Sequence, residues 1–237
     1  MKLFARDYQN ITADEKELER EIRNKYTIQL GKIKAYNSNM HREFPKAIRH
    51  HNSLFPNNYL DPVDLKDETK LKVLNQQFLK TIEDRETIET DILKFIKENR
   101  AYHIIGSIFS EYSFGHHDAY LFREFQLGNS YQVEYLLVGK SSDGYNFIFI
   151  EFENPYGRIS LANEEFGDVI RKGLSQVSDW MLWTEESYSS LSESFEKETN
   201  NQLPKEFYRL DTSRMNYAVV AGRRNDYKEK TNNDVSI

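Results

Sequence analysis

The sequence predicts a mixed α/β (α+β) domain preceded by a helical region. Apolar residues recur at helical spacing through much of the first hundred residues. After Arg100 the period changes, and short segments rich in β-branched and aromatic residues alternate with Gly, Ser, Asn and Asp. A helical period then returns and one more apolar strand follows it, so we expect the strands to meet in a single sheet.

Composition limits the class of protein. The chain has 237 residues, which allow one domain with a sizeable core or a small domain beside a medium one. Its net charge is −6, so any nucleic-acid surface has to be a local basic patch on an acidic body. It contains no cysteine, which excludes disulfides and thiolate zinc sites, and no apolar stretch long enough for a signal peptide or a membrane span. We expect a soluble, cytoplasmic protein with no membrane partner.

Three helices are predicted in the first third. Thr12-Ala-Asp-Glu15 has the form of a capping box, and apolar residues then recur at helical spacing at Leu18, Ile22, Tyr26 and Ile33. His50 to Pro62 carries Asn, Ser and two prolines and is predicted to be a loop. Two more amphipathic patterns predict helices over residues 71–82 and 88–99.

The region after Arg100 is predicted to hold most of the sheet. Its β-rich segments are His103–Phe109, Ala119–Leu127, Gln132–Val138 and Asn146–Phe152. A helix is expected from Glu164 to about Glu185, and a short apolar strand from Met215 to Ala221.

The most informative stretch is Tyr131 to Pro155, which reads YQVEYLLVGKSSDGYNFIFIEFENP. Asp143-Gly144 is a strong hairpin signal. If these two residues form the loop, Ser142 pairs with Tyr145 and Glu134 lies opposite Glu153. A four-residue loop is the alternative, and we expect it to place Glu134 opposite Glu151. Since strand side chains alternate, Glu134, Glu151 and Glu153 share one face in either register.

Two interpretations of this glutamate face remain open from the pattern alone. Like charges across a sheet repel, and a bound divalent cation would neutralise them with the oxygen ligands that hard ions prefer. The other interpretation is the solvent-facing stripe of an amphipathic hairpin. Phe147 and Phe149 fall on the same face as Glu151 and Glu153, which weakens that second interpretation, because a solvated face should not carry both rings.

A carboxylate strand, a hairpin and then a hydrophobic-Glu-x-[Lys or Glu] strand resemble the core of PD-(D/E)XK nucleases. More specifically, residues 83–224 resemble the nuclease domain of the Shedu family of bacterial anti-phage proteins. The segments that carry this resemblance are TIETDILKFIKENRAYHII, LGNSYQVEYLLVG, FIFIEFENP, KGLSQVSDWMLW and VVAGRR. The resemblance implies a restriction-endonuclease-like mixed sheet flanked by helices.

The resemblance also implies roles for individual residues. Glu134 falls where the family has a metal-binding Asp, and Glu151 matches the second metal-binding acid. Gln176 matches a helix glutamine that lies near the scissile phosphate. Glu89 matches an acidic position on the opening helix, as a candidate outer ligand or as an ordinary first-turn acid. Glu124, on a neighbouring strand, is expected to be structural.

Glu153 departs from the nuclease pattern, which commonly has Lys at this position to orient water and offset charge on the phosphate. Three explanations remain open. Glu153 is a ligand in a two-metal site, or a cation arrives from elsewhere, or catalysis is lost and the fold has another role. The candidates for such a cation are Lys140, Arg171 and Lys172.

Other polar clusters carry weaker signals. His116-His117-Asp118 and His50-His51 are predicted to lie in exposed segments, because no further ligand stands at metal-binding spacing. A basic group near the C-terminus is a candidate phosphate contact, although a solvated surface is the simpler interpretation. Its members are Lys205, Arg209, Arg214, Arg223 and Arg224.

The sequence therefore predicts a helical region over residues 1–82 and a PD-(D/E)XK-like nuclease domain over residues 83–237, either truncated at its C-terminus or naturally short. The expected activity is Mg²⁺- or Mn²⁺-dependent hydrolysis of DNA phosphodiester bonds, and the resemblance further implies a homo-oligomer and a role in anti-phage defence. Glu134, Glu151 and Glu153 are the expected metal ligands, and Glu153 and Gln176 are expected to position water or phosphate. The alternative is a catalytically inactive nuclease fold that binds DNA or a protein partner.

Overall fold

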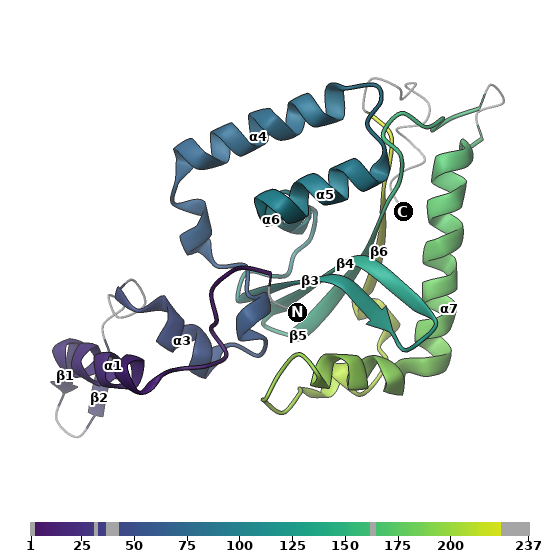
Figure 1. Ribbon diagram of the computed structural model, residues 1–237. Helices are drawn as coiled ribbons and strands as arrows, with labels where there is room; N and C mark the ends of the chain where they lie inside the picture. The colour runs from purple at the N-terminus through teal and green to yellow at the C-terminus, as the bar shows by residue number, and fades with distance from the viewer. Residues whose placement is uncertain (1–2, 31–32, 37–42, 162–164, 224–237) are drawn as a thin grey trace.

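The computed structural model describes residues 3–30, 33–36, 43–161 and 165–223 (Figure 1). Its helices are α1 (Ala13–Tyr26), α3 (Pro45–Asn52), α4 (Glu68–Glu83), α5 (Glu89–Asn99), α6 (Tyr102–Gly106) and α7 (Asp168–Glu196). Its strands are β1 (Thr27–Leu30), β2 (Ile33–Tyr36), β3 (Asp118–Leu127), β4 (Tyr131–Ser141), β5 (Gly144–Phe152) and β6 (Met215–Val220). Short 3₁₀ turns occupy Pro56–Asn58, Pro62–Leu65, Ser107–Glu111, Lys205–Phe207 and Thr212–Arg214.

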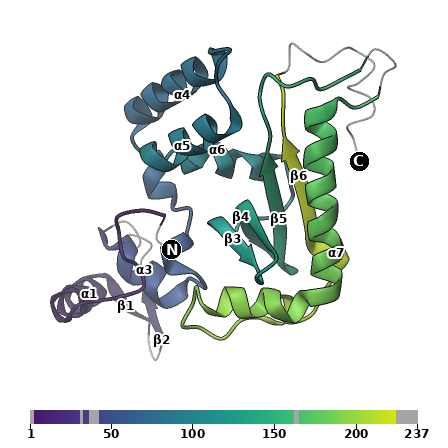
Figure 2. The same cartoon turned by 45° about the vertical axis from the view of Figure 1, so that its right-hand side comes forward.

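A four-stranded mixed sheet forms the centre of the molecule, in the order β3-β4-β5-β6. The first three strands are antiparallel neighbours, whereas β6 runs parallel to β5 and follows the long helix α7. Figures 1 and 2 show α7 along one side of the sheet, with α4, α5 and α6 on the other side. At Ser187 the backbone of α7 leaves the helical region, and the rest of the helix turns beneath the sheet. The mixed α/β fold class predicted from the sequence is confirmed.

Alternation along β5 gives the sheet two apolar faces. Phe147 and Phe149 pack in the aromatic core on the α7 side, with Trp180 and Phe195. Ile148 and Ile150 face the opposite way, into the core that α5 and α6 cover. Because both faces are buried, β5 reads as a continuous apolar run that ends at Glu151.

The β4–β5 hairpin adopts the second of the two registers considered from the sequence, with a different loop. Ser141 pairs with Gly144, so the loop consists of Ser142 and Asp143. Gly144 has φ of +113°, a value that favours glycine. Pairing continues to Tyr135 opposite Ile150, and the next step along both strands brings Glu134 level with Glu151. The expected Asp143-Gly144 loop, with Glu134 opposite Glu153, was wrong, and the observed register arises from a two-residue loop instead of the four-residue loop considered.

Two further predictions from the pattern were wrong. The segment His103–Phe109 was expected to be a strand but forms α6 and the 3₁₀ turn that follows it. Tyr102 and Ile105, three residues apart, are its buried positions, and tertiary burial at this helical spacing outweighs the β-branched composition. The first helix was expected to include Ile33, but it ends at Tyr26. Thr27 has an extended backbone, and its hydroxyl donates to the Arg23 carbonyl oxygen at 2.6 Å. Ile33 lies in β2.

The N-terminal elements pack together beside β3. The predicted capping box of α1 is present, with Thr12 N–H bonded to Glu15 Oε2 at 2.8 Å. Lys46 of α3 pairs with Glu15 at 2.6 Å, so α1 and α3 form one unit. The chain after α3 contacts the sheet through Asn58, whose side chain donates to the Leu121 carbonyl at 3.0 Å. The division of the chain at residue 82 stays a prediction. Within the described ranges, no helix combines the length and apolar character needed to cross a membrane.

Candidate functional site

Four glutamates and one lysine meet where β5 ends. Glu151 and Glu153 follow the apolar run of β5, and each is only 3% exposed. Glu89 is the first residue of α5, and Lys172 lies in the second turn of α7. We call Glu89, Glu134, Glu151, Glu153 and Lys172 the acidic corner. The solvent-facing interpretation of the hairpin is wrong for Glu151 and Glu153, because both side chains are buried.

Glu134 enters this corner because β4 and β5 separate there. Their ladder ends at Tyr135 and Ile150, so Phe152 pairs with β6 on one side but has no pairing with β4 on the other. The Glu134 Oε2 accepts a hydrogen bond from the Phe152 N–H at 2.7 Å. A side-chain carboxylate therefore takes the place of a strand carbonyl and is held beside Glu151.

Glu124 marks an irregularity in the neighbouring strand. Its φ is +54°, which is uncommon for a residue with a side chain, and the β3–β4 pairing is interrupted at this position. As a result Phe122 and Phe125, three residues apart, both reach the core on the α7 side. Glu124 makes ion pairs with Lys97 and Arg123, each at 3.5 Å. These contacts agree with the structural role expected for Glu124.

Burial and mutual repulsion raise the pKa of two of these acids. Burial raises the pKa of the Glu134 carboxyl, the charge of Glu151 raises it further, and the Phe152 N–H opposes the shift. The pKa of Glu151 rises to about 8, through burial and then the charges of Glu89 and Glu153, against the opposing effect of Lys172. The corner thus resists carrying its full negative charge unless a cation is present.

Lys172 supplies one positive charge. Its Nζ lies 2.8 Å from Glu153 Oε2 and 3.7 Å from Glu89 Oε2. The hydrogen bond to Glu153 raises the pKa of this ammonium group. The next residue, Gly173, lets α7 approach the sheet, since a Cβ there would lie 2.5 Å from Val219 Cγ1 and 3.2 Å from Glu153 Cγ.

The other two cations considered from the sequence lie elsewhere. Arg171 forms an ion pair with Asp168 on the exposed side of α7. The Lys140 ammonium lies 5.3 Å from the centre of the Tyr145 ring, near the hairpin end of β5. Of the three candidates, only Lys172 reaches Glu153.

Two buried oxygens in the corner have no hydrogen-bond partner within the described residues. They are Glu151 Oε2 and Glu153 Oε1. An unpaired buried carboxylate oxygen is costly, so each is a place where a ligand would be favoured. In the described part of the chain, however, no three His, Asp or Glu side chains converge as a formed metal site. Metal binding by Glu134, Glu151 and Glu153 therefore stays a prediction.

The remaining predicted site residues are more dispersed. Gln176 lies one helical turn after Lys172 and is half-buried, and no hydrogen bond joins it to the carboxylates among the described residues. His116 and His117 are both exposed before β3, as expected. Arg223 donates to the Ile82 carbonyl at 2.7 Å, while Arg224 lies outside the described residues.

The sequence pattern selected acids that the structure brings together but did not select the lysine. Lys172 stood among three candidate cations, and spacing along a helix does not fix which side chain turns toward the sheet. The neighbouring Gly173 was the available signal, because a glycine inside a helix indicates a close approach by another element.

Comparisons with known proteins place these residues in a family. No curated protein sequence and no solved structure matches the chain. Residues 86–236, well over half of the chain, match the family described as Shedu protein SduA, C-terminal. This match contains α5, the whole central sheet and α7, and therefore every residue of the acidic corner. The chain belongs to the Shedu SduA family.

Proposed function

We propose that this protein is a divalent-metal-dependent endonuclease that hydrolyses DNA phosphodiester bonds in defence against phage. Defence is the role that membership of the Shedu family implies. The observation that carries the nuclease proposal is the acidic corner, in which two buried carboxylates each keep an oxygen without a partner and a lysine stands beside them. Buried carboxylates that lack hydrogen-bond partners destabilise the fold, and such groups are typical of a site that binds a ligand.

The chemistry of the corner fits a hard divalent cation such as Mg²⁺ or Mn²⁺. Carboxylate oxygens are the ligands these ions prefer, and Glu134, Glu151 and Glu153 would supply them. When bound, such an ion lowers the pKa of a coordinated water and offsets charge on the phosphate. Small rotations of the Glu134 and Glu151 side chains would be needed, because Glu134 is held by the Phe152 N–H.

Lys172 has the role that the nuclease pattern gives to the lysine of its second strand. Its ammonium lies 2.8 Å from the residue that occupies the motif position, Glu153. From there it can donate a hydrogen bond to a phosphate oxygen, where negative charge grows in the transition state. Gln176, one turn further along α7, is placed to orient water or phosphate through its amide. This arrangement supports the second explanation for Glu153, in which the cation arrives from another element, and Glu153 remains a candidate metal ligand as well.

A second candidate function is that of an inactive nuclease fold that binds DNA or a protein. It is favoured by the lack of convergence among the carboxylates of the described residues. A protein of this kind would bind DNA without cutting it, with or without Mg²⁺. The two functions differ in one measurable property, which is metal-dependent strand cleavage.

A plasmid nicking assay tests the proposal. The full-length protein, with Mg²⁺ or Mn²⁺, should convert supercoiled plasmid to nicked or linear DNA, and EDTA should stop the reaction. Glu151→Ala should reduce nicking at least about 100-fold, since loss of a metal ligand should cost no less than loss of an outer-shell residue. Glu186→Ala, an exposed position on α7, is the matched control and should nick normally. Wild-type protein that binds plasmid without cutting it would favour the second function.

A further inference from the structure

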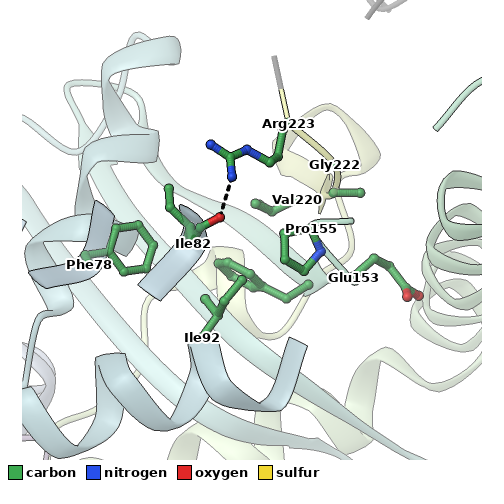
Figure 3. Close-up of a pocket in the computed structure, with 10 residues that line it drawn as sticks. Phe78, Ile82, Ile92, Glu153, Pro155, Val220, Gly222 and Arg223 are labelled. Atoms are coloured by element: carbon green, nitrogen blue, oxygen red, sulfur yellow. Dashed lines mark hydrogen bonds between the residues drawn. The ribbon is translucent and has the colours of Figure 1, made fainter. Parts of the chain in front are cut away.

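An apolar pocket lies next to the acidic corner, on the other side of Glu153. Its volume is about 360 Å³, at the small end of the range of ligand pockets. The lining residues are Phe78, Ile82, Ile92, Phe152, Glu153, Pro155, Val220, Ala221, Gly222 and Arg223. In Figure 3 Glu153 stands at the border of this pocket and its carboxylate points away from it, toward the acidic corner. Glu153 therefore belongs to both the pocket and the acidic corner.

We propose that this pocket receives a nucleobase of the DNA strand that lies along the acidic corner, turned out of its stack. The inference rests on the proposed function, because it takes the phosphate beside Glu153 to be part of a nucleic acid. It goes further in naming the substrate class, which is a strand with at least one unpaired nucleotide at the site. A base within an intact duplex would first have to be flipped out.

The lining suits a flat aromatic ligand. Phe78 of α4 and Phe152 of β5 supply aromatic rings, and Pro155 adds a rigid apolar wall. The Phe78 ring is half-buried and is supported by Phe95, with the ring centres 5.6 Å apart. Bases stack on such rings with little regard to sequence, because every base has a π-face.

The rim of the pocket carries a positive charge. One guanidinium nitrogen of Arg223, Nη1, donates to the Ile82 carbonyl oxygen at 2.7 Å (Figure 3). The same nitrogen also donates to the Tyr156 hydroxyl. The Tyr156 hydroxyl in turn donates to the Ile82 oxygen at 3.0 Å. These bonds fix the position of the guanidinium group, whose further N–H groups are donors suited to a phosphate or to the edge of a base.

The position of the pocket matches the chemistry of a nucleotide. A base is joined through its sugar to the phosphates on either side, so base and phosphate sites have to adjoin. Ile92 lines the pocket three residues after Glu89 of the acidic corner, and Glu153 belongs to both. A strand with its phosphate at the corner would bring a neighbouring base to the Phe78 ring.

The test compares two oligonucleotides of equal length, one single-stranded with ordinary bases and one whose sugar–phosphate backbone carries no bases. Binding of each to the full-length protein is measured by fluorescence anisotropy in Ca²⁺. Phe78→Ala should raise the Kd for the base-containing oligonucleotide about tenfold and leave the Kd for the abasic one unchanged, because stacking needs both ring and base. Leu79→Ala, a neighbouring exposed position on α4, should change neither Kd.

Phe78→Leu provides a second variant that retains apolar packing against Phe95 but removes the ring, and it should behave as Phe78→Ala does. Equal effects of these variants on both oligonucleotides, no effect on either, or no binding of the base-containing oligonucleotide by wild type would overturn the pocket proposal. Plasmid nicking without ring-dependent binding would overturn the pocket proposal alone. Ring-dependent binding without nicking would overturn the endonuclease proposal alone.

Discussion

Buried acids are treated in opposite ways in two regions of this molecule. Asp61, beside the N-terminal elements, is 5% exposed, and both of its oxygens are bonded. Arg49 Nε donates to one at 3.0 Å and the Val63 N–H donates to the other at 3.1 Å. In the acidic corner Glu151 and Glu153 are buried as deeply, yet each retains an oxygen without a partner among the described residues.

The difference separates an acid with structural contacts from the acids that we propose to be functional. Asp61 caps a 3₁₀ turn and holds Arg49 over the Tyr59 ring, so its charge joins α3 to the chain that follows. The corner gathers four carboxylates around one ammonium group, and repulsion among them opposes folding. The fold provides hydrogen-bond partners for both oxygens of Asp61 but not for both oxygens of Glu151. We therefore infer that the corner binds a cation.

The largest effect on stability is expected at Asp61. Asp61→Ala should lower the free energy of unfolding by about 3 kcal/mol, because Arg49 then loses its buried partner. Asp64→Ala is the control, as this acid pairs with Arg6 near the surface, and it should cost less than about 1 kcal/mol. Urea unfolding followed by circular dichroism measures both. Equal losses would mean that Asp61 has no special structural role.

A substitution of Lys172 tests whether the acidic corner is a catalytic site. Lys172→Met should reduce plasmid nicking about 100-fold, the effect typical of losing one donor to a developing oxyanion. Arg171→Met, at the adjacent position where the side chain pairs with Asp168, should leave nicking unchanged. If both variants nick as wild type does, Lys172 is not the cation that replaces the motif lysine.

A smaller effect of opposite sign is expected when a corner charge is neutralised. In metal-free buffer at a pH above the Glu151 pKa of about 8, where this carboxyl is ionised, Glu151→Gln should raise the free energy of unfolding by about 1 kcal/mol. The neutral amide removes repulsion and can donate to a neighbouring carboxylate. Thermal and urea unfolding in EDTA give the value. A loss of stability comparable to that of Asp61→Ala would mean that Glu151 is a structural acid after all.

Local patterns in the sequence predicted most of the central fold. The apolar, β-branched runs of β3, β4 and β5 lie close to their predicted bounds, because both faces of the sheet are buried and each period is sustained. The helix α7 was predicted to exist, but it continues to Glu196, well past the end expected near Glu185. The helix α6 and the 3₁₀ turn after it were missed, since their isoleucines and phenylalanine fit a strand equally well until the core they enter is known.

The acidic corner was predicted in part. Glu134, Glu151 and Glu153 were selected by alternation and by resemblance, but the hairpin register depended on whether Gly144 belonged to the loop or to the strand. The approach of Glu89 and Lys172 depends on how α5 and α7 pack at the end of β5, and no local pattern encodes this. The contrast between Asp61 and the acidic corner could not be predicted from the sequence either, because the burial and the hydrogen-bond partners of a side chain depend on the tertiary structure.

The most direct measurement of the central claim is a calorimetric titration of Mg²⁺ and Mn²⁺ into wild type, Glu151→Gln and Asp61→Asn. If the corner is a cation site, wild type and Asp61→Asn should bind metal alike. Glu151→Gln, which loses one anionic ligand, should bind at least about tenfold more weakly. Wild-type protein that binds neither ion, or Glu151→Gln that binds as tightly as wild type, would contradict this account.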